Sequence, residues 1–169
     1  MSDAQASTNL GVLTQHSIDE INEWMSRYPE DQKQSAVLAA LRVAQHQNDG
    51  FLTTELMDAC ADILQMSKIA VYEVASFYSM FETEPVGRHC IAICTNISCM
   101  LMGSQSIVDH VEKKYGIGLG ESTADGKIFL KVEEECLAAC AGGPMMQVDH
   151  AYHTNLTPEK VDAILDALD

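Results

Sequence analysis

The sequence predicts a chain of the α+β or α/β class, with an N-terminal four-helix domain followed by a mixed domain of element order β-α-β-β-α. Two observations predict this division. Apolar residues recur at helical spacing between residues 17 and 81, whereas after residue 87 short apolar runs bounded by turn residues alternate with helical segments. At 169 residues, the chain is long enough for one large domain or two small ones.

The first two helices are bounded by capping and stop residues. Ser17, with Glu20 three residues later, is the expected cap of the first helix, and Pro29 ends it. The second helix is expected from residue 34 to about residue 47, with Gly50 as its stop. Its predicted buried face consists of Val37, Leu38, Leu41 and Ala44.

Two more helices complete a helical domain that is expected to span residues 17–81, after a flexible N-terminus of residues 1–16. The third follows a Thr53 cap and has a regular apolar face made of Leu56, Met57, Cys60, Ile63 and Leu64. The fourth opens at Ser67 and has an aromatic stripe made of Val74, Phe77, Tyr78 and Phe81. Such a stripe is typical of a core, but part of it is also a candidate for docking on a partner.

The second domain is expected to span residues 88–169, after a linker of residues 82–87. Its predicted elements are a strand at 88–94, a helix at 104–115, strands at 127–132 and 145–148, a short strand at Tyr152, and a terminal helix opened by Thr157 and Pro158. Because a strand-helix-strand unit makes a right-handed parallel crossover, the first two strands are expected to be parallel neighbours. The later strands can join as a hairpin.

Composition excludes several classes of function. Ten basic and 25 acidic side chains give a net charge of -15, which repels phosphate backbones and anionic lipids, so nucleic-acid and membrane-surface binding are not expected. No apolar run reaches the roughly 20 residues that span a bilayer, and no signal sequence is recognised. A cytoplasmic location is therefore expected. In that reducing compartment, six cysteines are expected to bind metal or to do redox chemistry.

Four of the cysteines form two pairs, Cys94 with Cys99 and Cys136 with Cys140, and each pair follows a predicted strand. Because those strands are parallel neighbours, both loops leave the sheet at the same edge and the four thiolates can converge there. Sulfur ligands select zinc or iron-sulfur clusters. The Cys-x4-Cys and Cys-x3-Cys spacings are looser than the Cys-x2-Cys turns of structural zinc, which favours a [2Fe-2S] cluster with one pair on each iron.

Other interpretations of the cysteines remain. The four thiols could form a zinc clip in a structural adaptor, or be buried without a metal. Rieske ligation is excluded because it needs two histidines on one iron and no Cys-x-His occurs. A disulfide enzyme is disfavoured because Cys-x-x-Cys does not occur. Cys60, on a helix face, and Cys90, inside a strand, are expected to be inert core residues.

The residues around the two pairs are small or apolar. Methionines beside both pairs shield a cluster from water, and small residues let backbone amides approach its sulfur atoms. Glu133, Glu134 and Glu135 directly precede Cys136. Since negative charge penalises the addition of an electron, these glutamates predict a low reduction potential.

These motifs resemble the family of thioredoxin-like [2Fe-2S] subunits of NADH:quinone oxidoreductase, the bacterial respiratory complex I. The resemblance runs from about Ile18 to Leu168. It is carried by the segments IAVYEVASFYSMF (69–81), CTNISCMLMGS (94–104), ECLAACAGGPMMQV (135–148) and NLTPEKVDAIL (155–165). It implies a thioredoxin-like fold for residues 86–169, with Cys94, Cys99, Cys136 and Cys140 as ligands of one [2Fe-2S] cluster.

The resemblance also implies partners and a role. It implies an electron-transfer subunit of an oxidoreductase and translocase, with no complete active site in this chain alone. It further implies a neighbouring subunit that binds NADH and FMN, a larger iron-sulfur subunit close by, and an assembly peripheral to the inner membrane. The alternative is the equivalent diaphorase subunit of an NAD-linked hydrogenase or formate dehydrogenase. A flavin takes up the two electrons of a hydride together, so a nearby cluster can hold the second electron.

This sequence departs from the family pattern at two positions beside the cysteines. Ala138 stands where the family commonly has glycine, and Ser98 where it often has proline. Neither change removes a ligand, but the potential of the cluster is expected to differ.

Overall fold

The computed structural model describes residues 9–132 and 136–169, which form two compact units. The first unit spans Met1–Pro85 and the second Val86–Asp169. The division between them lies within residues 82–87, the segment predicted to be a linker. Glu133, Glu134 and Glu135, on which the prediction of a low potential depends, lie outside the described residues, as do residues 1–8.

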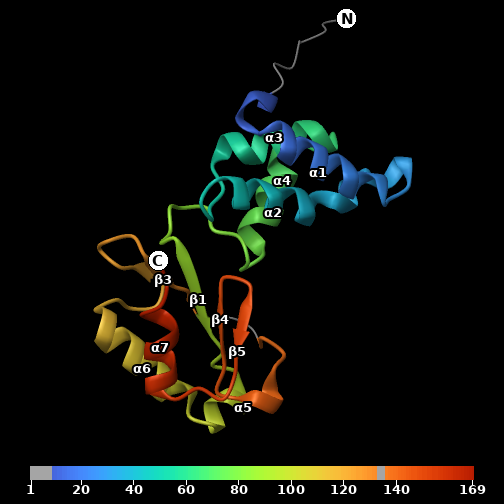
Figure 1. Ribbon diagram of the computed structural model, residues 1–169. Helices are drawn as coiled ribbons and strands as arrows, with labels where there is room; N and C mark the ends of the chain where they lie inside the picture. The colour runs from blue at the N-terminus through green and yellow to red at the C-terminus, as the bar shows by residue number, and fades with distance from the viewer. Residues whose placement is uncertain (1–8, 133–135) are drawn as a thin grey trace, which may run out of the picture. The chain divides into compact units, whose positions relative to one another are not determined.

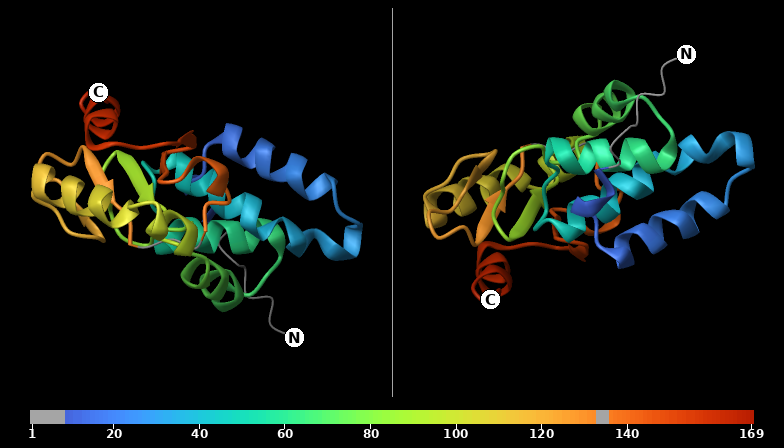
Figure 2. Two further views of the ribbon diagram at one scale, coloured as in Figure 1. Left: turned by 90° about the horizontal axis from the view of Figure 1, so that it is seen from below. Right: turned by 90° about the horizontal axis from the view of Figure 1, so that it is seen from above.

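The first unit consists of helices joined by turns, with no strand in the residues that the structure describes, and its helices lie against one another (Figures 1 and 2). Its elements are η1 (Asn9–Val12), α1 (Gln15–Ser26), η2 (Glu30–Ala36), α2 (Val37–Gln47), α3 (Thr54–Leu64) and α4 (Lys68–Phe77), where η marks a 3-10 helix. α1 contacts α2, α2 contacts α3, and α3 contacts both α4 and η1. Their shared core includes Ile21, Leu41, Leu52, Leu56 and Val71. The predicted four helices are confirmed.

The prediction that Ser17 caps the first helix is wrong. α1 begins at Gln15, and the capping side chain is Thr14, whose hydroxyl accepts a hydrogen bond from the Ser17 N–H at 3.2 Å. The chain is ordered before the helix because Leu13 is buried in the core of the first unit. The Gln47 side chain also holds this entry, accepting a hydrogen bond from the Thr14 N–H at 2.7 Å and donating one to the Val12 carbonyl at 2.8 Å. From residue 9 onward, the expected flexible N-terminus is therefore folded onto the unit.

The second helix is shorter than predicted and is rotated about its axis. Residues 30–36 form the 3-10 segment η2, so α2 begins only at Val37. Leu38 lies on the solvent side, while Ala40, Leu41, Val43 and Ala44 are buried. The small alanine side chains let neighbouring helices approach, which apolar periodicity alone does not reveal.

The third helix is confirmed and the aromatic stripe is not. The Thr53 hydroxyl accepts from the Leu56 N–H at 3.3 Å, as expected of a cap. α4 ends at Phe77 because Tyr78 has extended backbone angles, so the stripe does not continue along one helical face. Phe81 is buried in the core, whereas the Phe77 side chain is 80% exposed.

The second unit is a five-stranded sheet with helices (Figure 1). Its elements are β1 (His89–Ile93), α5 (Ile97–Leu101), α6 (Ser104–Tyr115), β2 (Glu121–Ser122), β3 (Ile128–Leu130), η3 (Cys140–Gly142), β4 (Met146–Val148), β5 (Ala151–His153) and α7 (Pro158–Leu165). The strand order is β2-β3-β1-β4-β5. Apart from α5, β2 and η3, which are too short to give a periodic signal, the order of elements matches the prediction.

The predicted sheet topology is confirmed. β1 and β3 are parallel, with Ile91 opposite Leu130, and β4 and β5 form an antiparallel hairpin. β1 also pairs with β4, so it lies in the middle of the sheet. Gly87, just before β1, is required by this close pairing because a Cβ there would lie 2.5 Å from the carbonyl carbon of Ile128.

The core of the second unit lies between the sheet and the helices α6 and α7, which contact each other. Buried side chains of β1, β3 and β4 meet those of both helices, among them Ile91, Leu130, Met146, Val108, Val111, Val161 and Leu165. At the surface, Lys114 donates to both carboxylate oxygens of Asp166, at 2.9 and 2.8 Å. This pair ties α6 to α7.

Candidate iron-sulfur site

The four cysteines predicted as ligands come from two loops at one edge of the sheet. Cys94 directly follows β1, and Cys99 lies in α5. Cys136 lies beyond the end of β3, and Cys140 opens η3. Because β1 and β3 are parallel neighbours, both loops start from the same edge of the sheet, as the crossover argument requires.

The structure brings the four thiols together. The Sγ atoms of Cys136 and Cys140 lie 3.7 Å apart. The Cys94 thiol lies near enough to those of Cys99 and Cys136 for both to lower its pKa, so it links the two pairs. Cys99 also interacts electrostatically with Cys140. All four cysteines are free thiols, without a disulfide.

The two pairs differ in exposure. Cys94 and Cys99 are each 1% exposed and form a small apolar cluster with Met145, against which Leu137 and Ala139 pack. Cys136 and Cys140 are exposed. A group bound by all four thiols is therefore enclosed on the side of the first pair and accessible on the side of the second.

Backbone N–H groups of both loops point at the sulfur atoms. Burial by itself raises the pKa of the Cys94 thiol, but N–H donation from Leu137 and Asn96 and the neighbouring Cys99 and Cys136 thiols together outweigh burial, so its pKa lies below the usual value. The Met145 N–H donates to Cys99, and the Ala138 N–H donates to Cys136 at 3.3 Å. Hydrogen bonds of this kind stabilise anionic sulfur, which is the form that binds metals.

The pKa values of two other thiols, those of Cys99 and Cys136, are raised. Burial and the neighbouring Cys94 thiol raise the pKa of Cys99 to about 11. The Ala138 N–H lowers the pKa of Cys136, yet the hydrogen bond with Cys140 and the other raising effects outweigh it, and the net shift is upward. Four thiolates this close repel one another unless a cation neutralises them, so metal binding and proton release are coupled.

The donor set and the backbone fit an iron-sulfur cluster. Four thiolates are the common ligand set of a [2Fe-2S] cluster. At Gly143, a Cβ would lie 3.3 Å from the Cys99 Sγ and 2.9 Å from the Met102 Sδ, so a residue without a side chain lets this loop approach the first pair. In the part of the chain that the structure describes, no three His, Cys, Asp or Glu side chains lie together in a group that could hold a single metal ion.

Ala138 adopts a backbone conformation that favours glycine. Its φ is 59°, in the left-handed region, and its N–H is the donor to Cys136. This explains why the family pattern has glycine there: the loop must turn sharply to direct the N–H at the sulfur. The sequence shows the alanine but gives no sign of the φ.

The two remaining cysteines are Cys60 in α3 and Cys90 in β1. Cys60 is fully buried in the first unit, and burial raises the pKa of its thiol to about 12. Its Sγ donates a weak hydrogen bond to the Ala40 carbonyl at 3.7 Å. Cys90 is half-buried in β1. Cys60 is an inert core thiol, as predicted.

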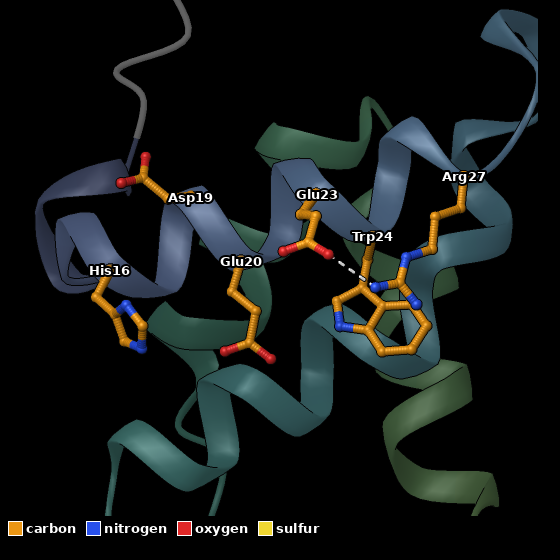
Figure 3. A pocket seen from close by; sticks show the side chains of 6 residues that line it. All are labelled: His16, Asp19, Glu20, Glu23, Trp24 and Arg27. Carbon is orange, nitrogen blue, oxygen red and sulfur yellow. Dashed lines mark hydrogen bonds and ion pairs between the residues drawn. The ribbon is translucent and has the colours of Figure 1, made fainter.

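A hollow on the surface of α1 offers no comparable chemistry. Figure 3 shows its lining, which is a single helical face carrying His16, Asp19, Glu20, Glu23, Trp24 and Arg27. Arg27 donates to Glu23 at 2.8 Å, and its guanidinium lies 4.0 Å from the centre of the Trp24 ring. These contacts stabilise the exposed face of α1.

A parallel crossover with an added hairpin, and four thiols gathered where its loops meet, define an iron-sulfur protein of the ferredoxin class. The chain belongs to the thioredoxin-like [2Fe-2S] ferredoxin family, whose model matches residues 21–169. One [2Fe-2S] cluster is therefore its cofactor.

Similar proteins are subunits of NADH dehydrogenases. An NADH-quinone oxidoreductase subunit of Rickettsia bellii is 40% identical over 161 residues, which cover 92% of this chain and 96% of that protein. The corresponding subunit of Rhizobium meliloti is 42% identical over 88% of this chain and 86% of its own length. The mitochondrial NADH dehydrogenase [ubiquinone] flavoprotein 2 of Dictyostelium discoideum is 37% identical over 92% of this chain and 63% of its own.

Among solved structures, the air-oxidised NAD+-reducing [NiFe]-hydrogenase has the same fold. The match has a TM-score of 0.65 at 22% identity and covers 77% of this chain but only 22% of the hydrogenase chain. No helix within the described residues is long and apolar enough to cross a membrane.

Proposed function

We propose that this chain is the electron-transfer subunit of an NADH-quinone oxidoreductase and that Cys94, Cys99, Cys136 and Cys140 hold its [2Fe-2S] cluster. The observation that carries the ligand assignment is the convergence of the four thiols from two loops at one sheet edge. The bacterial relatives, which are NADH-quinone oxidoreductase subunits, support the role, since they match this chain over nearly its whole length.

The chain's own residues hold and tune the bound group. When bound, a [2Fe-2S] cluster accepts and releases one electron at a time. The N–H groups of Asn96, Leu137, Met145 and Ala138 stabilise negative charge on sulfur. Cys94 and Cys99 keep one side away from water, and exposed Cys136 and Cys140 form the side through which electrons are exchanged.

The electron donor is proposed to be a partner subunit that binds NADH and FMN, with a larger iron-sulfur subunit nearby. Large apolar side chains are exposed around α5, beside the site: Ile97, Met100, Leu101 and Met102. Contiguous exposed apolar residues are typical of protein interfaces. We assign this surface, which we call the α5 rim, to the flavin-binding subunit, because that contact brings the thiols close to a flavin.

A second candidate contact is a set of exposed apolar residues that includes Phe77 and Tyr78 of the predicted aromatic stripe. On and just after α4, the exposed apolar residues are Ile69, Tyr72, Phe77, Tyr78 and Met80. Aromatic anchors of this kind are enriched in interfaces. We assign them to docking within the same assembly, which is proposed to be peripheral to the inner membrane.

A second candidate function is the diaphorase subunit of an NAD-linked hydrogenase or formate dehydrogenase. The fold match to the NAD+-reducing hydrogenase favours it. The two functions share the flavin partner and differ in the electron acceptor. Co-purification from the native host distinguishes them, since the first predicts quinone-reducing subunits and the second a hydrogenase or formate dehydrogenase subunit.

The ligand assignment is tested by metal analysis and low-temperature EPR of the dithionite-reduced protein. The expected result is about two irons per chain and one paramagnetic signal. Replacing each proposed ligand by serine should change or abolish that signal, whereas Cys60→Ala should leave it unchanged. A colourless protein that contains zinc would contradict the proposal, as would an unaltered spectrum in any of the four serine variants.

A further inference from the structure

Two buried hydroxyl groups are unpaired in the segment that frames the first cysteine pair. Among the described residues, Thr95 Oγ1 and Ser104 Oγ are the buried side-chain oxygen or nitrogen atoms without a hydrogen-bond partner. Both lie between Cys94 and the start of α6. Since buried hydroxyls in proteins normally form hydrogen bonds, we expect an acceptor for these two hydroxyls that is not part of the described residues.

Thr95 is held against the first ligand. It lies between Cys94, which is buried, and Asn96, whose N–H donates to the Cys94 sulfur. The backbone therefore turns back towards this sulfur atom, and Thr95 is the residue at that turn. Its Oγ1 atom is buried and has no hydrogen-bond partner among the residues that the structure describes.

Ser104 is the first residue of α6 and is fully buried. It follows Met102 and Gly103, and the Met102 Sδ and the Cys99 Sγ both lie close to the point that a Cβ at Gly143 would occupy. A hydroxyl at this helix start can find a backbone acceptor, because Ser106 donates to the Gly103 carbonyl at 2.7 Å. The Ser104 hydroxyl has no such acceptor.

We propose that the Thr95 and Ser104 hydroxyls donate hydrogen bonds to the sulfur atoms of the bound cluster and thereby raise its reduction potential. This inference rests on the proposed function, because it needs the cluster on these four cysteines. Thiolate and sulfide sulfur atoms bear negative charge, and a hydroxyl supplies one donor. Reduction adds a further negative charge, so hydrogen bonds to sulfur stabilise the reduced state more than the oxidised one.

The test is an EPR-monitored redox titration of the holoprotein. Thr95→Val and Ser104→Ala remove one hydroxyl each with little change of shape. At a fixed ambient potential, each is expected to lower the ratio of reduced to oxidised cluster about tenfold, which is a shift of about 59 mV for a one-electron couple. Thr95→Ser keeps the hydroxyl, and Ser106→Ala removes a hydroxyl that is already paired, so both should keep the wild-type ratio.

The outcomes separate this inference from the proposed function. A wild-type protein without a [2Fe-2S] signal contradicts the function and the inference together. A normal signal with an unmoved potential in Thr95→Val and Ser104→Ala contradicts only the inference. If Thr95→Val does not retain its cluster, Ser104→Ala and Thr95→Ser decide: an unmoved potential in Ser104→Ala or a shifted one in Thr95→Ser overturns the inference.

Discussion

Replacing Ala138 by glycine should stabilise the second unit. Ala138 has a φ of 59°, and the left-handed conformation costs an L-residue with a Cβ roughly 1–2 kcal/mol. Glycine removes that strain but increases the entropy of the unfolded chain, which costs about 0.4–1 kcal/mol. The difference favours glycine by about 0.5–1 kcal/mol. For a unit of this size, that corresponds to an increase in Tm of about 3–6 °C.

The matched control is the next residue. Ala139 has a φ of -116°, which alanine adopts without strain, and it packs against the buried cysteines. Ala139→Gly should therefore lower the Tm. Both variants are compared with the wild type in anaerobic thermal scans at one scan rate, recording circular dichroism and the visible absorbance of the cluster together. If Ala138→Gly lowers the Tm as Ala139→Gly does, then relief of backbone strain is not the controlling effect and the reasoning is refuted.

Three further changes test other parts of the structure. Gly87→Ala should destabilise the second unit by about 2 kcal/mol or more, because the alanine Cβ would lie 2.5 Å from the backbone carbonyl carbon of Ile128 in β3. Urea unfolding measures this change, and an unchanged urea midpoint would contradict the register of β1 and β3. Lys114 lowers the pKa of Asp166, so the pair stabilises the fold above the usual Asp pKa of about 3.9 and this stability is lost as the pH falls below it. Lys114→Met should therefore weaken the protein near neutral pH and flatten its acid unfolding curve, and a curve parallel to that of the wild type would refute the assignment. Leu101→Asp should abolish co-purification with the flavin-binding subunit while the EPR signal persists. The control Leu119→Asp, at another exposed leucine, should leave co-purification intact. If both variants lose co-purification equally, the α5 rim is not part of the interface.

The main architecture of the second unit was predictable because it follows from connection rules. A strand-helix-strand unit must return parallel, so β1 and β3 pair as expected and the cysteine loops begin at one edge. Helix α3 was predictable for a similar reason, since Thr53 and a regular apolar face are local signals. Short elements such as α5 and β2 lack a full period of either pattern and were missed.

The errors in the first unit come from contacts between distant residues. Thr14 rather than Ser17 caps α1 because Leu13 and Gln47 fix the entry of the chain from outside the helix. Phe77 was grouped with Phe81 by helical spacing, but the turn at Tyr78 sends the two side chains to different environments. Periodicity assumes that a helix continues, and it carries no information on where packing ends it.

For this protein, the sequence alone determined the helical and mixed halves, the parallel crossover and the four thiols, since these depend on the spacing of residues along the chain and on the handedness of connections. Only the tertiary structure decided which cysteines are buried, which backbone N–H groups reach sulfur, and that Ala138 is strained while Thr95 and Ser104 are buried without partners. These properties depend on how segments far apart in the chain pack together. Residue spacing sets which groups can meet, and packing sets the solvent exposure and hydrogen bonding that tune their chemistry.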